Sequence, residues 1–170
     1  MANSAQIVAI FAGALILFAL GDTAVATDPE FFVQGQVFCE VCRTNFINRL
    51  SEPMEGATVR LECRGDNVGN ITFGIEGVTD AGGNYKLKAT GDHEDEDCQV
   101  TLVKSSRLDC QETPSEGWAM QPSSKITITK NNGFHDDIRH ANPLGFTKKE
   151  RDPACQELFK ELQINPDSLA

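Results

Sequence analysis

Apolar and polar residues alternate along short stretches of the chain, most clearly over Ala57–Cys63, where the odd-numbered positions are apolar or cysteine and the even-numbered ones are polar. A period of two is typical of a strand with one face towards a core and the other towards water. The same alternation recurs in residues 33–39, 71–75, 85–89, 98–102 and 126–129. Because turn-rich segments separate these stretches, the sequence predicts an all-β fold, an antiparallel β-sandwich or barrel of about six to seven strands.

The spacing changes near the C-terminus, where apolar residues follow a helical period at Cys155, Leu158, Phe159 and Leu162. This spacing predicts one short amphipathic helix. Asp152 is a suitable N-cap and Pro153 suits the first helical position, while Asn165-Pro166 ends the pattern. We expect Cys155 to attach this helix to the β body.

The N-terminus has the features of a secretory signal. Residues 7–20 are an almost unbroken apolar run, and small residues follow it up to Ala24-Val25-Ala26, an A-x-A cleavage site. The run is too short for a comfortable membrane span, and no later stretch is long enough, so no membrane insertion is expected. The sequence therefore predicts a signal peptide over residues 1–26 and a single secreted, extracellular domain over residues 27–170.

The charge of the chain limits its partners. The formal net charge is −10, and it becomes −9 when Asp22 leaves with the signal. Such a surface repels a phosphate backbone. Nucleic-acid binding is therefore not expected.

All six cysteines follow the predicted cleavage site. An even number in a secreted chain predicts a framework of three disulfides, although six cysteines allow about fifteen pairings and their spacing does not choose among them. The segment Cys39-Glu40-Val41-Cys42 is a C-x-x-C motif, which elsewhere can be a redox pair or half of a zinc site. Here it ends a predicted strand and has no second ligand pair. Each cysteine is therefore expected to form a structural bridge elsewhere in the chain.

No other segment predicts catalysis or a cofactor. His93, His135 and His140 form no Ser/His/Asp or Cys/His arrangement, and we expect them to be exposed surface residues. Residues 91–97 are strongly acidic but lack the register of an EF-hand, so they predict a solvated hairpin loop, with weak calcium binding as the alternative. The sequence therefore predicts no catalytic, cofactor or metal site, and a protein that is not an enzyme.

One sequon can accept an N-glycan. Asn70-Ile71-Thr72 has a permitted middle residue and lies where a polar loop enters a predicted strand. We expect glycosylation at Asn70, with an unmodified turn asparagine as the alternative.

Residues 34–43, Gln-Gly-Gln-Val-Phe-Cys-Glu-Val-Cys-Arg, resemble the signature of the Ole e I family of plant pollen proteins, Gly-x-Val-aromatic-Cys-acid-x-Cys-Arg. Residues 56–63, Thr79-Asp80 with Tyr85, and residues 137–146 are also similar to family segments, so the resemblance covers nearly the whole mature chain. The chain departs from the usual pattern at three positions, with Phe38 for Tyr, Glu40 for Asp, and Val41 for Thr or Pro.

The resemblance implies a disulfide pairing of Cys39 with Cys110, Cys42 with Cys155, and Cys63 with Cys98. It also implies a secreted glycoprotein, an interaction or signalling ligand in pollen hydration or pollen-tube growth, and a potential allergen. The implied partners are the ectodomain of a receptor-like kinase at the cell surface and, for an allergen, IgE. The alternative is an extracellular carrier or inhibitor module for a small ligand or an enzyme, indicated only by the apolar residues around Phe134 and Phe146.

Overall fold

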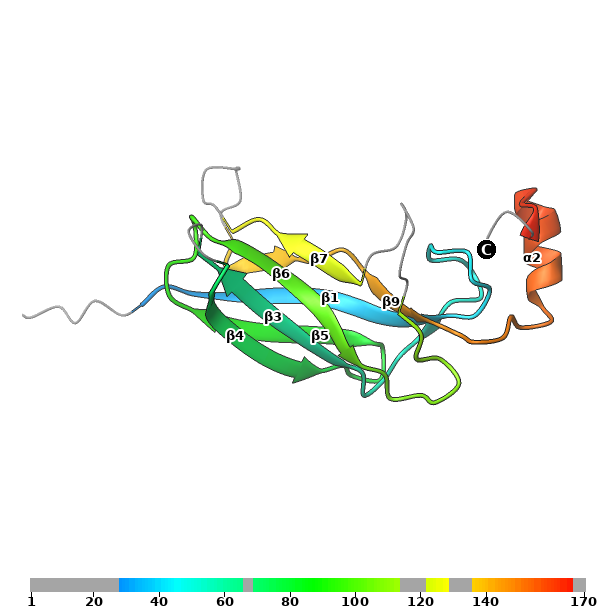
Figure 1. Ribbon diagram of the computed structural model, residues 1–170, viewed down its shortest axis with the longest axis horizontal. Coiled ribbons are helices and arrows are strands. Elements are labelled where there is room, and N and C mark those ends of the chain that lie inside the picture. Colours follow the sequence, from blue (N-terminus) through cyan, green and yellow to red (C-terminus); the bar gives the residue numbers. More distant parts are fainter. Residues whose placement is uncertain (1–27, 66–68, 114–121, 129–135, 167–170) are drawn as a thin grey trace, which may run out of the picture.

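The computed structural model describes residues 28–65, 69–113, 122–128 and 136–166 (Figure 1). Within these residues the chain forms nine strands and one helix. In chain order they are β1 (Glu30–Glu40), β2 (Glu52–Pro53), β3 (Thr58–Arg64), β4 (Ile71–Val78), β5 (Asn84–Thr90), β6 (Asp97–Lys104), β7 (Ser123–Ile126), β8 (Ile138–His140), β9 (Leu144–Thr147) and α2 (Cys155–Leu162).

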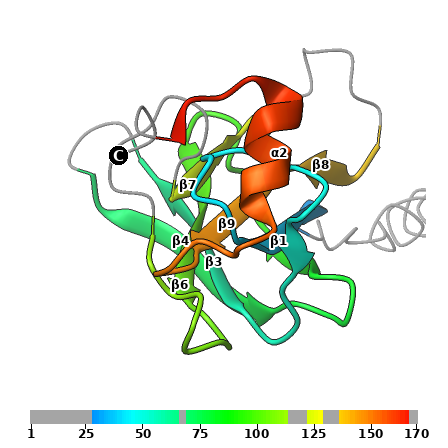
Figure 2. The same cartoon turned by 90° about the vertical axis from the view of Figure 1, so that its right-hand side faces the viewer.

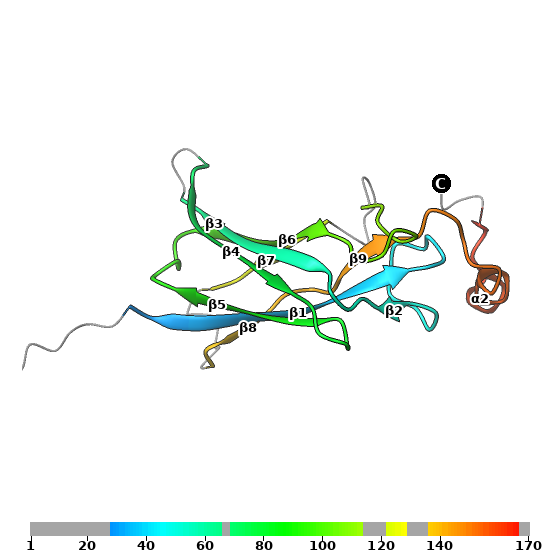
Figure 3. The same ribbon diagram turned by 90° about the horizontal axis from the view of Figure 1, so that it is seen from below.

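The strands form two sheets that face each other, which confirms the predicted sandwich (Figure 3). In the first sheet β1 lies at the centre, with β5 antiparallel to it and β2 pairing antiparallel near its end. The strands β8 and β9 also pair with β1, and both run parallel to it, an arrangement that the sequence did not predict. The second sheet is antiparallel throughout, in the order β4-β3-β6-β7.

The core lies between the sheets and is built from the alternating positions. Val59, Leu61 and Cys63 on β3 have no exposed surface, and every second residue of β5 from Tyr85 is buried in the same way. Gly35 faces Tyr85 across the β1–β5 pair, and a side chain at this position would collide with the Tyr85 hydroxyl. The glycine is therefore required so that the aromatic ring can lie over β1.

Two predicted elements differ from the structure. The strand expected over residues 126–129 is β7, which begins earlier and ends at Ile126; Thr129 lies outside the described residues. The inward position before Ile126 is the buried Ser124, whose hydroxyl accepts a hydrogen bond from the Asn142 N–H at 2.8 Å, so the apolar pattern does not extend to it. The acidic segment over residues 91–97 is not a hairpin loop, because β5 belongs to the first sheet and β6 to the second.

The predicted C-terminal helix is α2, at one end of the sandwich (Figure 2). It begins at Cys155, and the Asp152 carboxylate accepts a hydrogen bond from the Ala154 N–H at 2.9 Å in the turn before it. The helix ends at Leu162, the capping residue Gln163 is left-handed with φ 55°, and the Ile164 N–H donates to the Phe159 carbonyl at 2.9 Å. This is a Schellman-type ending, so the helix stops before Asn165-Pro166 for a backbone reason.

Candidate functional site

Two disulfides and α2 gather at the end of β1. Cys39 is bonded to Cys110 and Cys42 to Cys155, the pairs that the family resemblance implies, and all four residues are fully buried. The two cysteines of the C-x-x-C motif therefore have different partners, far away in the sequence. A redox pair needs the two cysteines bonded to each other, and a zinc site needs thiolates, so this arrangement supports only a structural role for both residues.

Glu40, between these cysteines, is fully buried and folds the following loop, residues 41–51, around its carboxylate. The carboxylate accepts hydrogen bonds from the backbone N–H groups of Cys42 at 3.0 Å and Thr44 at 2.7 Å. It also accepts bonds from the Thr44 hydroxyl at 3.1 Å and from the Asn48 amide at 3.0 Å. A buried carboxylate with this many donors is satisfied internally, so it acts as the centre of the loop and is not available as a general base.

The loop and the helix form one surface at this end of the molecule (Figures 1 and 2). Arg49 of the loop forms an ion pair with Glu161 of α2 at 2.9 Å, and the Asp152 N–H donates to the Val41 carbonyl at 3.1 Å. Ile47 is 49% exposed on this surface, although the loop around it is held by buried hydrogen bonds. We name residues 41–51 together with α2 the cysteine-rich end.

His93 lies at the opposite end of the core and is only 7% exposed, so the expectation of an exposed histidine is wrong for this residue. Its ring centre lies 6.2 Å from that of Phe31 and 5.1 Å from that of Phe73. Its Nδ1 is 2.8 Å from Glu96 Oε2 and its Nε2 is 3.0 Å from the Thr90 carbonyl. The polar neighbours of His93 in the sequence hid this burial, because the apolar contacts come from β1 and β4. His140 is exposed, as expected, and His135 lies outside the described residues.

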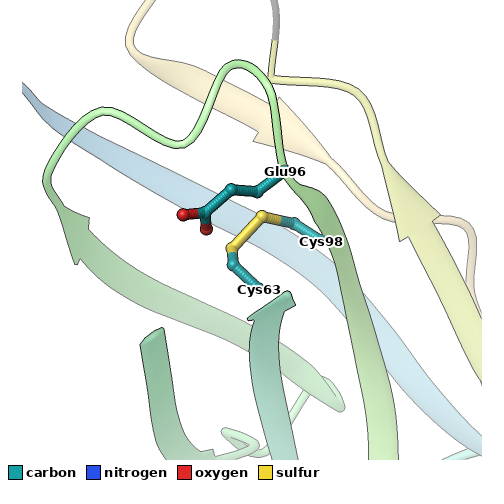
Figure 4. Close-up of side chains that lie close together, drawn as sticks. All are labelled: Cys63, Glu96 and Cys98. Carbon is teal, nitrogen blue, oxygen red and sulfur yellow. A yellow bond between two sulfur atoms is a disulfide. The ribbon is translucent and has the colours of Figure 1, made fainter. Parts of the chain in front are cut away.

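The Glu96 carboxylate, which is bonded to His93, lies beside the Cys63–Cys98 disulfide. Figure 4 shows the carboxylate next to the two sulfurs. Burial acts to raise the pKa of Glu96, but hydrogen bonds from Thr72 and His93 outweigh it and hold this pKa below its usual value. The Thr72 hydroxyl donates to Glu96 at 2.6 Å and not to the imidazole. Thr72, His93 and Glu96 therefore lack the order of a catalytic triad, in which the hydroxyl of the nucleophile is bonded to the histidine.

Glu96 and the two sulfurs are the one cluster of three potential metal ligands among the described residues. The sulfurs are bonded to each other, and a disulfide offers no thiolate for a metal. The cluster therefore supports neither a metal centre nor catalysis.

We expect His93→Ala to lower the free energy of unfolding by about 2–3 kcal/mol, because it removes a packed ring and the hydrogen bonds that the imidazole makes to Glu96 and to the Thr90 carbonyl. Urea unfolding followed by circular dichroism measures this effect. The control is His140→Ala at the exposed histidine, for which a change within about 0.5 kcal/mol is expected. Equal effects of the two substitutions would contradict a structural role for His93.

The remaining expected sites are placed as follows. Asn70 is exposed and comes directly before β4, so its side chain is at the surface. Phe146 is 2% exposed and pairs with Cys39 in the first sheet, so it belongs to the core and not to an open ligand pocket. Phe134 lies outside the described residues.

Comparison with known proteins gives one consistent family. Residues 29–163 match the family described as "Pollen protein Ole e 1 like". The chain is 45% identical to pollen allergen Che a 1 of Chenopodium album, over 94% of each chain. It is 43% identical to the anther-specific protein LAT52 of Solanum lycopersicum, over 92% of this chain and 95% of the other. The crystal structure of the major plantain pollen allergen Pla l 1 is similar with a TM-score of 0.66 and 42% identity, covering 75% of this chain and all of the other.

Proposed function

Because the chain belongs to the Ole e 1-like family of pollen proteins, we propose that it is a secreted, non-enzymatic protein that acts outside the cell by binding another macromolecule. The observation that carries the proposal is the cysteine-rich end. There, a loop without regular secondary structure is held by the buried Glu40 and by two disulfides. A loop ordered before binding loses little conformational entropy when a partner docks, which favours recognition.

Secretion accounts for the three disulfides, because such bonds persist in oxidising compartments outside the cytosol. We propose that residues 1–26 are removed as a signal peptide and that the mature domain covers residues 27–170. Within the described part of the chain, no helix is both long and apolar enough to cross a bilayer.

The partner that we propose is the ectodomain of a receptor-like kinase on pollen tubes or stigma cells. The names of the relatives support a role in pollen, since they include an anther-specific protein and several pollen proteins. The cysteine-rich end carries an exposed apolar residue, Ile47, and, two residues further along the loop, Arg49, which forms an ion pair with Glu161 of α2. Apolar anchors within a polar rim are typical of protein interfaces.

We also propose that the protein binds IgE in sensitised hosts. Relatives with 44–48% identity are named as pollen allergens in Chenopodium, Crocus, Kali and Ligustrum. A compact, disulfide-held fold presents the same folded surface to antibodies wherever the chain is displayed. Inhibition of IgE binding between this protein and its relatives tests the proposal.

The test of receptor binding uses the oxidised, full-length secreted protein against ectodomains of receptor-like kinases displayed on pollen tubes. Ile47→Asp is expected to weaken binding at least about tenfold, because it places a charge in the apolar centre of the proposed contact. The matched control is Val103→Asp on β6, where the valine is 44% exposed on the second sheet. Equal weakening by the two substitutions would show that the receptor contact is not at the cysteine-rich end. If the unmodified protein bound no cell surface at all, the proposed function would be wrong.

The glycan and the bridges are tested together by peptide mapping under non-reducing conditions, on protein secreted from plant tissue. We expect a mature N-terminus at Thr27, an N-glycan on Asn70, and the three cysteine pairs of the structure. Asn70→Gln is expected to remove the mass of one glycan without disturbing the bridges, because Asn70 is exposed. An unmodified Asn70 in the secreted protein would contradict this proposal.

A further inference from the structure

The outer face of the first sheet carries a hollow of about 660 Å³ that none of the sites above uses. Strands β1 and β5, the ends of β4 and β8 and the segments after them provide its lining. Asp80 is among these residues, and its carboxylate already accepts hydrogen bonds from the backbone of Gly82 and Asn84 within its own turn. The polar and apolar side chains important here are Gln34, Gln36, Asn84, Lys86, His140 and Pro143. We name this hollow the sheet groove. Its strands β1, β5 and β8 run side by side in the lower layer of the sandwich in Figure 3.

The strand register places three hydrogen-bonding side chains in one row across the groove. Gln34 on the central strand pairs with Lys86 of β5 on one side and with His140 of β8 on the other. Its neighbour Val33 is buried, so the alternation directs Gln34 away from the core. Neighbouring strands lie about 4.7–4.9 Å apart, so one ligand can contact all three side chains.

These groups are poorly occupied within the molecule. Among the described residues, the side chains of Gln34 and His140 form no hydrogen bond. The Lys86 ammonium lies 4.2 Å above the Phe32 ring and forms no ion pair there, whereas Lys88, two residues further along β5, pairs with Glu30 at 2.7 Å. Gln36 uses its amide nitrogen to bond the Gly82 carbonyl at 3.0 Å, and within the described part of the chain its amide oxygen forms no hydrogen bond. The row thus offers donors and acceptors to an external partner.

We propose that the sheet groove binds an oligosaccharide that contains one uronic acid unit among neutral sugars. Side-chain amides donate and accept at once, as sugar hydroxyls do, and the groove has such an amide in Gln34. The amide nitrogens of Gln36 and Asn84 already donate to the Gly82 carbonyl and to Asp80, so these two side chains offer their oxygens as acceptors. Lys86 supplies a charged donor for a single carboxylate. Pro143 and Val78, which is 63% exposed, provide apolar edges for the C–H faces of sugar rings. The net charge of −10 disfavours a densely charged polyanion.

This site is distinct from the cysteine-rich end, so it goes beyond the proposed receptor contact and is tested separately. The experiment is a titration of the ¹⁵N-labelled full secreted protein, followed by the NMR signals of its amides. The two probes have four sugar units each: xylotriose carrying one glucuronic acid, and xylotetraose. We expect shifts at the amides of residues 33–36, 84–87 and 139–141. The acidic probe is expected to bind at least about tenfold more tightly than the neutral one at low salt, and this preference should fall as salt is added.

Two variants locate the contact. Lys86→Gln is expected to remove the preference for the acidic probe, and Gln34→Ala to weaken both probes. The control is Lys104→Gln at the exposed end of β6 in the second sheet, which should leave both affinities unchanged. Absence of shifts at the three strands with either probe would overturn the proposal. Equal affinity for both probes in the unmodified protein would contradict the proposed contact between Lys86 and the carboxylate of the ligand. If glucuronic acid alone bound as tightly as the acidic oligosaccharide, the proposal that the groove binds several sugar units would be wrong.

Discussion

Replacing Glu40 with alanine is expected to lower the free energy of unfolding by about 3–5 kcal/mol, because at least two buried backbone N–H groups lose their only strong acceptor. Those groups belong to Cys42 and Thr44, and the Asn48 side chain loses its carboxylate partner as well. Thermal and urea unfolding measure the effect. Amide hydrogen exchange should show that residues 41–51 lose protection first, since the substitution acts on the loop and not on the sheets.

Two further variants make the result specific to the carboxylate. Glu40→Asp keeps the carboxylate but places it one methylene group further from the N–H groups of the loop. This variant should therefore be more stable than Glu40→Ala and less stable than the unmodified protein. Glu112→Ala removes a carboxylate whose side chain is 43% exposed and which pairs with Arg43 at 2.6 Å, and it should cost less than about 1 kcal/mol. If Glu40→Ala and Glu112→Ala were equally mild, Glu40 would not be the organising centre of the loop.

Removing the Cys39–Cys110 bridge by substituting both cysteines with alanine is expected to cost about 4 kcal/mol. The bridge spans 71 residues, and in the chain-entropy model its loss gives that many residues more freedom in the unfolded state. Both cysteines are also fully buried, and Cys39 lies on the central strand of the first sheet. Because a domain of this size has a total stability of about 5–15 kcal/mol, the variant should be close to unfolding at about 37 °C. Calorimetry of the variant and of the unmodified protein measures the difference.

The comparison variant lacks the Cys42–Cys155 bridge. This bond spans 113 residues, so the chain-entropy model gives it a contribution to global stability similar to that of Cys39–Cys110. It connects α2 to the 41–51 loop near the end of the described chain, so in the folded protein its loss should release the helix before either sheet. Hydrogen exchange should therefore rise in α2 before it rises in β3 and β6. Exchange that rises in β3 and β6 before α2 in this comparison variant, or an unchanged melting temperature without Cys39–Cys110, would contradict the assigned roles of the two bridges.

The alternation of apolar residues was sufficient to predict the strands that pack on both sides of one core. Ala57–Cys63 and residues 85–89 became β3 and β5 with the expected inward faces, because a period of two reports directly which positions meet the core. The helical spacing from Cys155 to Leu162 predicted α2 for the same reason. Local patterns report local geometry, and these elements depend on little else.

Three features depended on partners that are distant in the sequence. The burial of His93 requires Phe31 and Phe73 from other strands, and no pattern near residue 93 indicates them. The parallel pairing of β8 and β9 with β1 joins short segments whose three or four residues are too few to show a period. The sheet groove exists only because this pairing brings His140 next to Gln34 and Lys86.

The sequence by itself determined the fold class, the positions of most strands, the C-terminal helix and the family, since each of these is written in consecutive residues or in a motif. The tertiary structure alone decided which strands are neighbours, that Glu40 is the centre of a loop, that His93 is a core residue, and that three polar side chains share one groove. The physical reason is that packing and hydrogen bonding act between side chains that meet in space, and one sequence does not state which residues those are.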